Sequence, residues 1–319
     1  MIERDAAVRR LDDLYVIAAG LDHPECVNPG PDGRLYAGGE LGQIYQIEHE
    51  TQTAIHVTDA GGWVGGVCVD GAGMVYACTL GGVSAVMRIN PADGEVDTWC
   101  ESADGRRLVM PNYAAFAPDG ALWFTDSGPE DFATKAGRLI RVPVGGGDAK
   151  VMSAGHQLHF PNGMCFDADG LPCYLETFTP RLSRLRDGRP ELIAEFPGNS
   201  PDGVALCEDG GFLVSMYYPF RLVYVPPKGG DYTVVLDDLT GMNIPMPTNV
   251  CFYGDGLRNI AIASLGGWVI KGIDLGITGA ALQYPCGASR PAAAAIESPD
   301  SEQETMNECV SKGGLPDGY

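Results

Sequence analysis

A short motif that recurs six times at one register constrains the fold of this chain more than any other feature. The six copies begin at residues 23, 63, 110, 160, 200 and 246 and read HPECV, WVGGV, MPNYA, FPNGM, SPDGV and MPTNV. In every copy a turn glycine follows eight residues after the third position, and the copies are 40 to 50 residues apart. That spacing is typical of the four-stranded blade of a β-propeller.

The residues around these motifs also indicate an all-β protein. The 44 glycines and 23 prolines of the 319 residues separate short Val-, Leu-, Tyr- and Phe-rich runs, without long stretches of helical periodicity. The sequence therefore predicts a six-bladed β-propeller of four-stranded antiparallel blades. The apolar run LYVIAAG at residues 14–20 precedes the first copy. We expect it to close the ring as the outer strand of the last blade, which removes exposed sheet edges.

The chain divides into residues 1–285, predicted to form the propeller, and residues 286–319, which lack periodicity and are predicted to be a surface extension or disordered. Asp and Glu number 42 against 21 for Lys and Arg, giving a net charge of −21. Because this charge repels polyanions, we expect neither nucleic acid nor a membrane surface as a partner, but a small-molecule substrate. The oligomeric state stays open.

Localisation is predicted from the start of the chain and from the cysteines. The N-terminus is acidic and lacks the apolar run of a secretory leader, and no stretch approaches a membrane span. The ten cysteines show no metal-binding spacing. We expect them to be small buried hydrophobic residues in a reducing cytoplasm, with disulfides as the alternative.

The third residue of each motif copy predicts a functional site. In a propeller the first strand of each blade lines the central channel, so equivalent positions at the start of these strands form a ring around one end of it. We call these six positions the channel ring: Glu25, Gly65, Asn112, Asn162, Asp202 and Thr248. Two carboxylates and two amide oxygens suit a hard divalent cation, Ca²⁺ above all. Mg²⁺ and Mn²⁺ also fit, and Zn²⁺ fits less well because no His or Cys occupies the ring.

The alternative interpretation is structural, because P-N-G and P-D-G are ordinary turn sequences. Other candidates follow the second strand of each hairpin, where the chain returns to the ring end. They are Asp126, Glu176, Phe178, Tyr217, Tyr218 and Leu265. Asp126 and Glu176 are equally well explained as buried acceptors for backbone N–H groups.

Several of these segments resemble the senescence-marker-protein/gluconolactonase family of six-bladed propellers, which is related to diisopropyl-fluorophosphatase. The resemblance lies in HPECV, MPNYAAFAPDGALWFTDSG, FPNGMCFDADG, SPDGVAL and LGGWVIKGIDLGITGAAL. It implies that Glu25, Asn162 and Asp202 hold the metal and that Asn112 lies beside it or binds it. It also implies that Asp202 is the base that activates water or, less often, the nucleophile.

The sequence also departs from the family at the site. Sugar-lactonase members usually carry Arg and Asp where this chain has Met110 and Tyr113, so a less polar substrate is expected. Further candidate substrate contacts are Asn112, Trp63, His159, Glu176, Phe178 and Tyr218. For His159 the alternative is a structural histidine beside a strand. For Trp63 and Tyr113 the alternative is packing between blades.

The function predicted from the sequence is metal-dependent hydrolysis of a lactone or related ester, by polarisation of the carbonyl and stabilisation of its oxyanion. Two alternatives remain open at this point. One is phosphotriester hydrolysis at the same metal. The other is a non-hydrolytic propeller, either similar to strictosidine synthase or limited to ligand binding.

Overall fold

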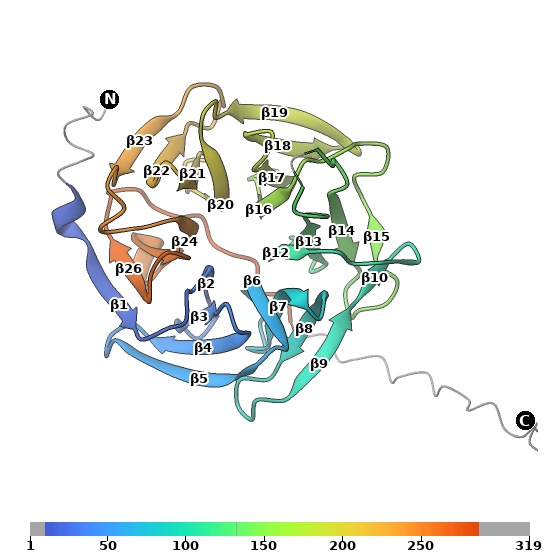
Figure 1. Ribbon diagram of the computed structural model, residues 1–319, viewed down its shortest axis with the longest axis horizontal. Coiled ribbons are helices and arrows are strands. Elements are labelled where there is room, and N and C mark those ends of the chain that lie inside the picture. The colour runs from blue at the N-terminus through green and yellow to red at the C-terminus, as the bar shows by residue number, and fades with distance from the viewer. Residues whose placement is uncertain (1–9, 132, 287–319) are drawn as a thin grey trace, which may run out of the picture. The chain divides into compact units, whose positions relative to one another are not determined.

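The described part of the chain, residues 10–131 and 133–286, forms a six-bladed β-propeller in the computed structural model (Figure 1). Each blade is a four-stranded antiparallel sheet, so the predicted fold class is confirmed. The predicted extension at 286–319 lies outside the described residues except for Cys286.

The first three blades use strands in chain order from the centre outward. Blade 1 contains β2 (Cys26–Pro29), β3 (Leu35–Gly38), β4 (Gln43–Glu48) and β5 (Thr53–Asp59). Blade 2 contains β6 (Gly62–Val69), β7 (Val75–Gly82), β8 (Ala85–Ile89) and β9 (Val96–Cys100). Blade 3 contains β12 (Pro111–Phe116), β13 (Leu122–Asp126), β14 (Arg138–Val142) and β15 (Lys150–Val151). A short hairpin, β10 (Ser102–Ala103) and β11 (Arg106–Arg107), links blades 2 and 3.

The last three blades follow the same plan, except that the outermost strand of blade 6 comes from the N-terminal part of the chain. Blade 4 contains β16 (Pro161–Phe166), β17 (Pro172–Glu176), β18 (Arg181–Arg186) and β19 (Arg189–Glu195). Blade 5 contains β20 (Ser200–Leu206), β21 (Phe212–Tyr218), β22 (Arg221–Val225) and β23 (Thr233–Asp237). Blade 6 contains β24 (Pro247–Tyr253), β25 (Asn259–Ser264), β26 (Val269–Ile273) and β1 (Tyr15–Ala19).

The N-terminal strand β1 closes the ring, as predicted. It pairs antiparallel with β26, from Tyr15 opposite Gly272 to Ala19 opposite Val269. Strands from the two ends of the propeller therefore share one sheet, and their backbone pairing holds the ring closed.

The repeated turns form as the register predicts. All six turn glycines have positive φ, between 67° and 85°, a conformation that favours glycine. In blades 1, 3 and 5 the Asp before the glycine supports the turn. In blade 3, for example, Asp119 Oδ1 accepts a hydrogen bond from the N–H of Ala121 at 3.0 Å.

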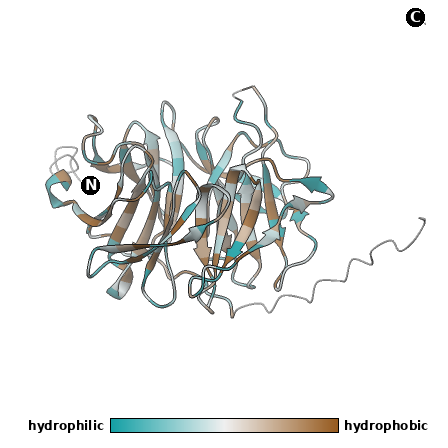
Figure 2. Cartoon of the chain, turned by 60° about the horizontal axis from the view of Figure 1, so that its bottom comes forward, coloured by the Kyte–Doolittle hydropathy of each residue, from teal (hydrophilic) through white to brown (hydrophobic). Residues whose placement is uncertain are grey.

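The hydrophobic core is divided into six clusters, one between each pair of neighbouring blades. Figure 2 shows the corresponding hydrophobic stretches along the strands and hydrophilic residues in the connecting loops. Between blades 2 and 3, Cys68, Cys78 and Cys100 pack in the same cluster as Phe124 and Ile140. All nine described cysteines are free and seven are buried. The prediction that cysteines act as small buried hydrophobic residues is confirmed for those seven.

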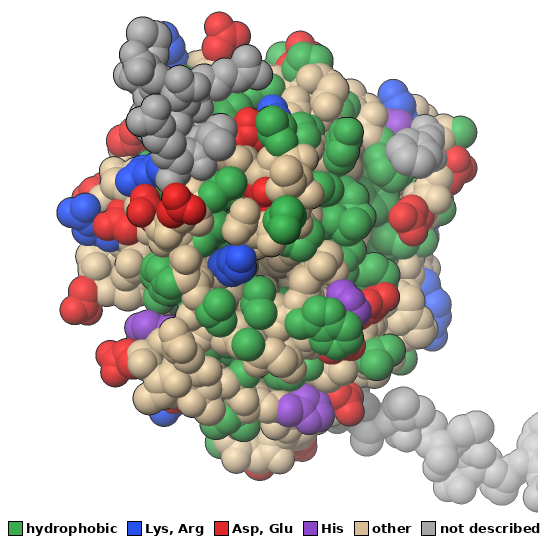
Figure 3. All heavy atoms as spheres, turned by 60° about the vertical axis from the view of Figure 1, so that its left-hand side comes forward, with side chains coloured by type: hydrophobic (Ala, Val, Ile, Leu, Met, Phe, Trp, Pro, Cys, Tyr) green, Lys and Arg blue, Asp and Glu red, His purple; other side chains and the backbone are tan. Residues whose placement is uncertain are grey.

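Helical structure is limited to two 3-10 helices in the described residues, η1 (Arg10–Asp13) and η2 (Asp255–Leu257). Within that part of the chain no helix is long and apolar enough to cross a membrane. The surface carries the excess acidity of the sequence. Acidic side chains occupy several parts of the face shown in Figure 3 and do not form one patch.

The innermost strands approach one another closely where each motif turns into its strand. A side-chain carbon at Gly163 would lie 2.4 Å from the backbone oxygen of Asp202, and one at Gly203 would lie 2.6 Å from that of Thr248. Glycine is therefore required at these positions, each directly after a channel-ring residue. Because Gly163 and Gly203 have no side chain, the ring residues of blades 4, 5 and 6 can lie close together.

Candidate metal and catalytic site

Four channel-ring residues are the second or third residue of an innermost strand, whereas Glu25 directly precedes β2 and Gly65 is the fourth residue of β6. Asn112, Asn162 and Asp202 each fall within an interruption of the pairing between the first and second strands of their blade. Such bulges redirect side chains out of the sheet pattern. All four candidate ligands are largely buried, with exposures of 9% for Glu25, 4% for Asn112 and Asn162, and 8% for Asp202.

Within the described residues the two ring carboxylates form no ion pair with a basic side chain. Burial raises the pKa of Glu25 to about 8, and the neighbouring Glu40 and Glu130 add to the shift. Burial and then the charge of Glu25 raise the pKa of Asp202 well above its usual range, with partial compensation from the Asn162 amide. Glu25 Oε2 is buried and has no hydrogen-bond partner in the part of the chain that the structure describes. An orphaned carboxylate oxygen beside a second unpaired carboxylate fits a divalent cation, which would favour the ionised form of both groups.

A hydrogen-bond chain orients the amide of Asn162. Thr177 Oγ1 donates to the carbonyl oxygen of Pro201 at 2.8 Å, so it accepts at 3.2 Å from Asn162 Nδ2. Because the nitrogen is held by Thr177, Asn162 Oδ1 is left available as a ligand. Sequence reasoning missed Thr177. Its position, directly after β17 and equivalent to the candidate Tyr217 of blade 5, is the sequence signal that could have identified it.

Other hydroxyl groups hold the backbone of the channel ring across blade boundaries. Thr125 Oγ1 in blade 3 donates to the carbonyl of Asn162 at 2.8 Å, and Ser215 Oγ in blade 5 donates to that of Thr248 at 3.1 Å. Thr248 Oγ1 in turn donates to the carbonyl of Glu25 at 2.7 Å. Thr248, which is not one of the four candidate ligands, therefore links the last blade to the first.

Asp126 and Glu176 are occupied by structural contacts. Asp126 accepts hydrogen bonds from the backbone N–H groups of Val109 and Met110 and forms an ion pair with Arg138. Glu176 accepts from the N–H of His159 at 2.7 Å and from Arg181 Nε at 2.6 Å. The two acids are fully or almost fully buried. They anchor the loops that carry Met110 and His159 toward the ring, which agrees with the alternative interpretation of these acids.

Aromatic side chains surround the ring end. Trp63 lies beside Glu25, although its indole N–H makes no hydrogen bond of ordinary geometry. Phe160 stacks on Phe178 with ring centroids 4.6 Å apart, and His159 meets Phe178 edge-on at 5.3 Å. Phe160 was not predicted. Like the candidates Trp63 and Met110, it is the first residue of its motif copy. This equivalent position is the sequence signal that could have identified Phe160.

The remaining candidates differ in their relation to the ring. His159 is 7% exposed, with Nδ1 3.1 Å from Thr179 Oγ1. Its Nε2 is buried and finds no hydrogen-bond partner among the described side chains and backbone. Burial and the nearby Asp202 and Glu25 carboxylates raise the pKa of Tyr217, which places that phenol near both acids. Tyr218 is 60% exposed and lies further out. Met110 is only partly buried.

Tyr113 lies below the ring, inside the channel. It is 5% exposed, and its hydroxyl accepts a hydrogen bond from Asn28 Nδ2 of blade 1 at 3.3 Å. The side chain thus reaches from blade 3 to blade 1 and closes the channel beneath the ring. This placement makes Tyr113 part of the floor of the site.

A second group of ionisable side chains lies near the start of blade 1. His23 Nδ1 is 3.1 Å from Asp22 Oδ1 and 3.2 Å from Glu40 Oε2, so the three could hold a metal ion. His23 also packs against Trp268, with ring centroids 4.3 Å apart. The group is more exposed than the channel ring, and sequence reasoning did not find it.

The fold and the ring together define a class of protein: a six-bladed propeller with an oxygen-rich site at one end of its channel. Residues 41–266 match the SMP-30/Gluconolactonase/LRE-like region, and the chain belongs to that family. Residues 7–47 match a second description, the N-terminal part of strictosidine synthase-like proteins.

Two relatives from Arabidopsis thaliana carry the strictosidine synthase name. Strictosidine synthase-like protein 8 is 25% identical over 243 residues, which covers 65% of this chain and 63% of the relative. Strictosidine synthase-like protein 1 is 28% identical over 231 residues, covering 64% and 57%. This chain therefore matches less than two thirds of the length of these relatives.

Solved structures support the fold. A gluconolactonase from Xanthomonas campestris has a TM-score of 0.69 at 21% identity, covering 82% of this chain and 89% of its own. A calcium-binding regucalcin from Agrobacterium tumefaciens has a TM-score of 0.66 at 14% identity, covering 85% and 98%. At these identities the likeness concerns the architecture alone.

Proposed function

We propose that this chain is a divalent-cation-dependent hydrolase of lactones or related esters, acting at the channel ring. The observation that carries the proposal is the pair of buried, uncompensated carboxylates, Glu25 and Asp202, joined by the oriented amide of Asn162. Membership of a family that includes gluconolactonases supports a lactone substrate. Ca²⁺ is the proposed cation because the ligand set is oxygen only.

In this proposal Glu25, Asn162 and Asp202 hold the cation, with Asn112 as a further ligand or a contact to the substrate oxygen. A cation held there would supply Lewis-acid polarisation of the ester carbonyl. Asp202 accepts the proton of the attacking water as the carbon–oxygen bond forms. It then returns the proton to the alkoxide released when the ring or ester bond breaks.

The surrounding side chains set the environment of this step. Trp63, Met110, Phe160 and Phe178 present apolar surface around the carboxylates, which favours a less polar acyl group than a sugar acid. Tyr217 lies near both acids and can donate a hydrogen bond to a substrate oxygen. His159 and Tyr218 are proposed as outer contacts.

The test combines metal content with turnover. Purified wild-type protein is expected to contain about one divalent cation per chain, and chelation is expected to abolish hydrolysis of a hydrophobic lactone. Asp202→Asn should lower kcat/KM by about 10²- to 10⁴-fold, the range for loss of a general base. The matched control is Asp169→Asn, an exposed turn acid of blade 4, which should change neither metal content nor rate. Lactone turnover that survives complete chelation would refute the proposal.

A second candidate is favoured by the two relatives named strictosidine synthase-like and by the match over residues 7–47. In that case the channel ring would serve a non-hydrolytic reaction. A metal-loaded protein that turns over no lactone, carboxylic ester or phosphotriester would support this candidate. Relative rates on a lactone and a phosphotriester separate the two hydrolytic possibilities in the same assay.

A further inference from the structure

The end of the channel opposite the ring contains a cavity of about 420 Å³, which we call the far cavity. The six positions three residues after the channel ring all line it: Asn28, Cys68, Ala115, Cys165, Ala205 and Cys251. Tyr113, which also lines the cavity, lies between this layer and the ring and bonds to Asn28. The far cavity is therefore separate from the candidate catalytic site.

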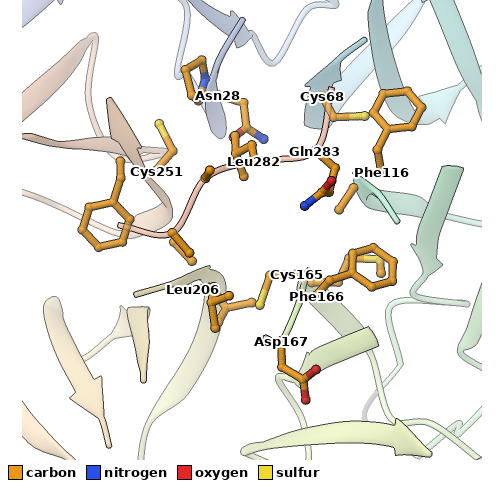
Figure 4. Close-up of a pocket in the computed structure, with 18 of the residues that line it drawn as sticks. Asn28, Cys68, Phe116, Cys165, Phe166, Asp167, Leu206, Cys251, Leu282 and Gln283 are labelled. Atoms are coloured by element: carbon orange, nitrogen blue, oxygen red, sulfur yellow. The ribbon is translucent and has the colours of Figure 1, made fainter. Parts of the chain in front are cut away.

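The walls of the far cavity are apolar and mostly uncharged. Phe116 and Phe166 flank it, as Figure 4 shows, and Phe252 contributes a third aromatic ring. Burial raises the pKa of the Cys68 and Cys165 thiols well above the usual range, so these sulfurs are neutral. Neutral thiols are poor metal ligands. This cavity does not have the chemistry of a cation site.

Charged side chains are confined to the turns at its border. Asp167 pairs with Arg184 at 3.4 Å and accepts the N–H of Leu171 in its own turn, while Glu208 is exposed to solvent. No Lys or Arg is among the described residues that line the cavity. An anionic ligand would therefore lose its hydration without gaining a partner. For a cationic ligand the acids among the described lining residues are Asp167, which already pairs with Arg184, and the solvent-exposed Glu208.

Two amide groups supply polarity. Asn28 Nδ2 donates to the carbonyl of Val67 at 2.7 Å and to Tyr113, whereas within the described residues its Oδ1 accepts no hydrogen bond. The side chain of Gln283 also lines the cavity, and Figure 4 shows it among the aromatic and sulfur-containing residues. Asn28 Oδ1 thus offers a free acceptor on an otherwise apolar wall.

A segment after β26, residues 279–285, crosses this end of the channel; we call it the strap (Figure 1). The N–H of Ala280 donates to the carbonyl of Leu206 in blade 5 at 3.0 Å. On the other side the N–H of Gly71 donates to Pro285 at 2.7 Å, and the Tyr284 hydroxyl donates to the carbonyl of Pro29 at 3.1 Å. Tied to blades 5, 2 and 1, the strap covers the cavity and provides Leu282 and Gln283 as part of its lining.

We propose that the far cavity is a second binding site, for a flat, uncharged aromatic molecule that carries one hydrogen-bond donor. The volume lies within the usual range for small-molecule pockets, and three phenylalanine rings offer stacking surface. The donor of the ligand would meet Asn28 Oδ1. This site is independent of the hydrolysis proposed at the channel ring.

The test uses indole as the probe and the full-length protein. Isothermal titration should show saturable binding of one indole per chain, and 1-methylindole, which lacks the N–H, should bind roughly tenfold more weakly. Ala205→Leu fills the cavity from blade 5 and should abolish indole binding. Ala92→Leu, at an exposed turn of blade 2, is the matched control and should bind like wild type.

Folding and the catalytic site are monitored in the same samples. The melting temperature and calcium affinity of Ala205→Leu should equal those of wild type, and Ala115→Leu replaces it if it fails to fold. Absence of saturable indole binding to wild type, or equal binding by a folded cavity-filled variant, would overturn the proposal. Calcium binding is measured separately. Failure of the channel-ring proposal would appear as absent calcium binding, whereas failure of the far-cavity proposal would appear as absent indole binding.

Discussion

Two pairs of buried carboxylates in this propeller have opposite surroundings. Asp126 and Glu176, at the ends of second strands, each pair with an arginine and accept backbone N–H groups. Glu25 and Asp202, in the channel ring, have no cationic partner among residues 10–131 and 133–286, and burial raises the pKa of both. The same residue types at similar depth thus perform different tasks: the first pair stabilises loops, and the second pair is arranged to receive a ligand.

Removing one carboxylate of each pair should have opposite effects on stability. Asp126→Ala leaves the Arg138 guanidinium and the N–H groups of Val109 and Met110 without their acceptor, which should cost about 3–5 kcal/mol of unfolding free energy. Asp202→Ala in chelator-treated protein removes an uncompensated acid and should be neutral or stabilising. Urea denaturation measures both. An equal loss from both variants would break the comparison.

The pH dependence of stability should come from the ring pair. The pKa of Glu25 rises from about 4.5 to about 8 on folding, so between these values the folded chain keeps a proton that the unfolded chain loses. Stability without metal should therefore fall as pH rises through this window, by about 1.4 kcal/mol per pH unit from Glu25. Denaturation of chelated protein at pH 5 and pH 8 checks this.

Two variants of the same experiment isolate the cause. Glu25→Gln should reduce the slope, because the proton that Glu25 retains on folding is gone and only the contribution of Asp202 remains. Saturating Ca²⁺ should abolish the slope between pH 5 and pH 8, since the carboxylates that bind the cation are then ionised in the folded chain as they are in the unfolded chain. A slope that is unchanged in Glu25→Gln would show that another group carries the pH dependence.

A smaller effect, on calcium affinity, is expected from substitution of Thr177, which hydrogen-bonds to the ring residue Asn162 but is not itself a ring residue. Thr177→Val keeps the volume but releases Asn162 Nδ2, so calcium affinity should fall by about 10- to 100-fold. Thr177→Ser should restore affinity because it keeps the hydroxyl. Thr79→Val is the control, since the Thr79 hydroxyl donates to the backbone of Val83 and Ala85 within blade 2. Equal calcium affinities of Thr177→Val and Thr177→Ser in a calcium titration would contradict the orienting role of the Thr177 hydroxyl.

The sequence alone determined the fold and the positions of the candidate ligands. The six motif copies share one register. In a propeller, equivalent residues of the innermost strands lie at the same depth in the channel, so the sequence alone was enough to select Glu25, Asn112, Asn162 and Asp202. Closure by residues 14–20 followed from the same count of strands. Local turn chemistry and strand periodicity carry this information because each blade is built from neighbouring residues.

Only the tertiary structure decided how these residues are partnered. The sequence could not separate Asp126 and Glu176 from catalytic candidates, because their arginine partners lie on other strands. It gave no sign that Thr177 orients Asn162, that Tyr113 closes the channel floor, or that the strap covers a second cavity. These relations depend on contacts between blades and on side-chain direction, and residues far apart in the chain come together only when the ring has closed.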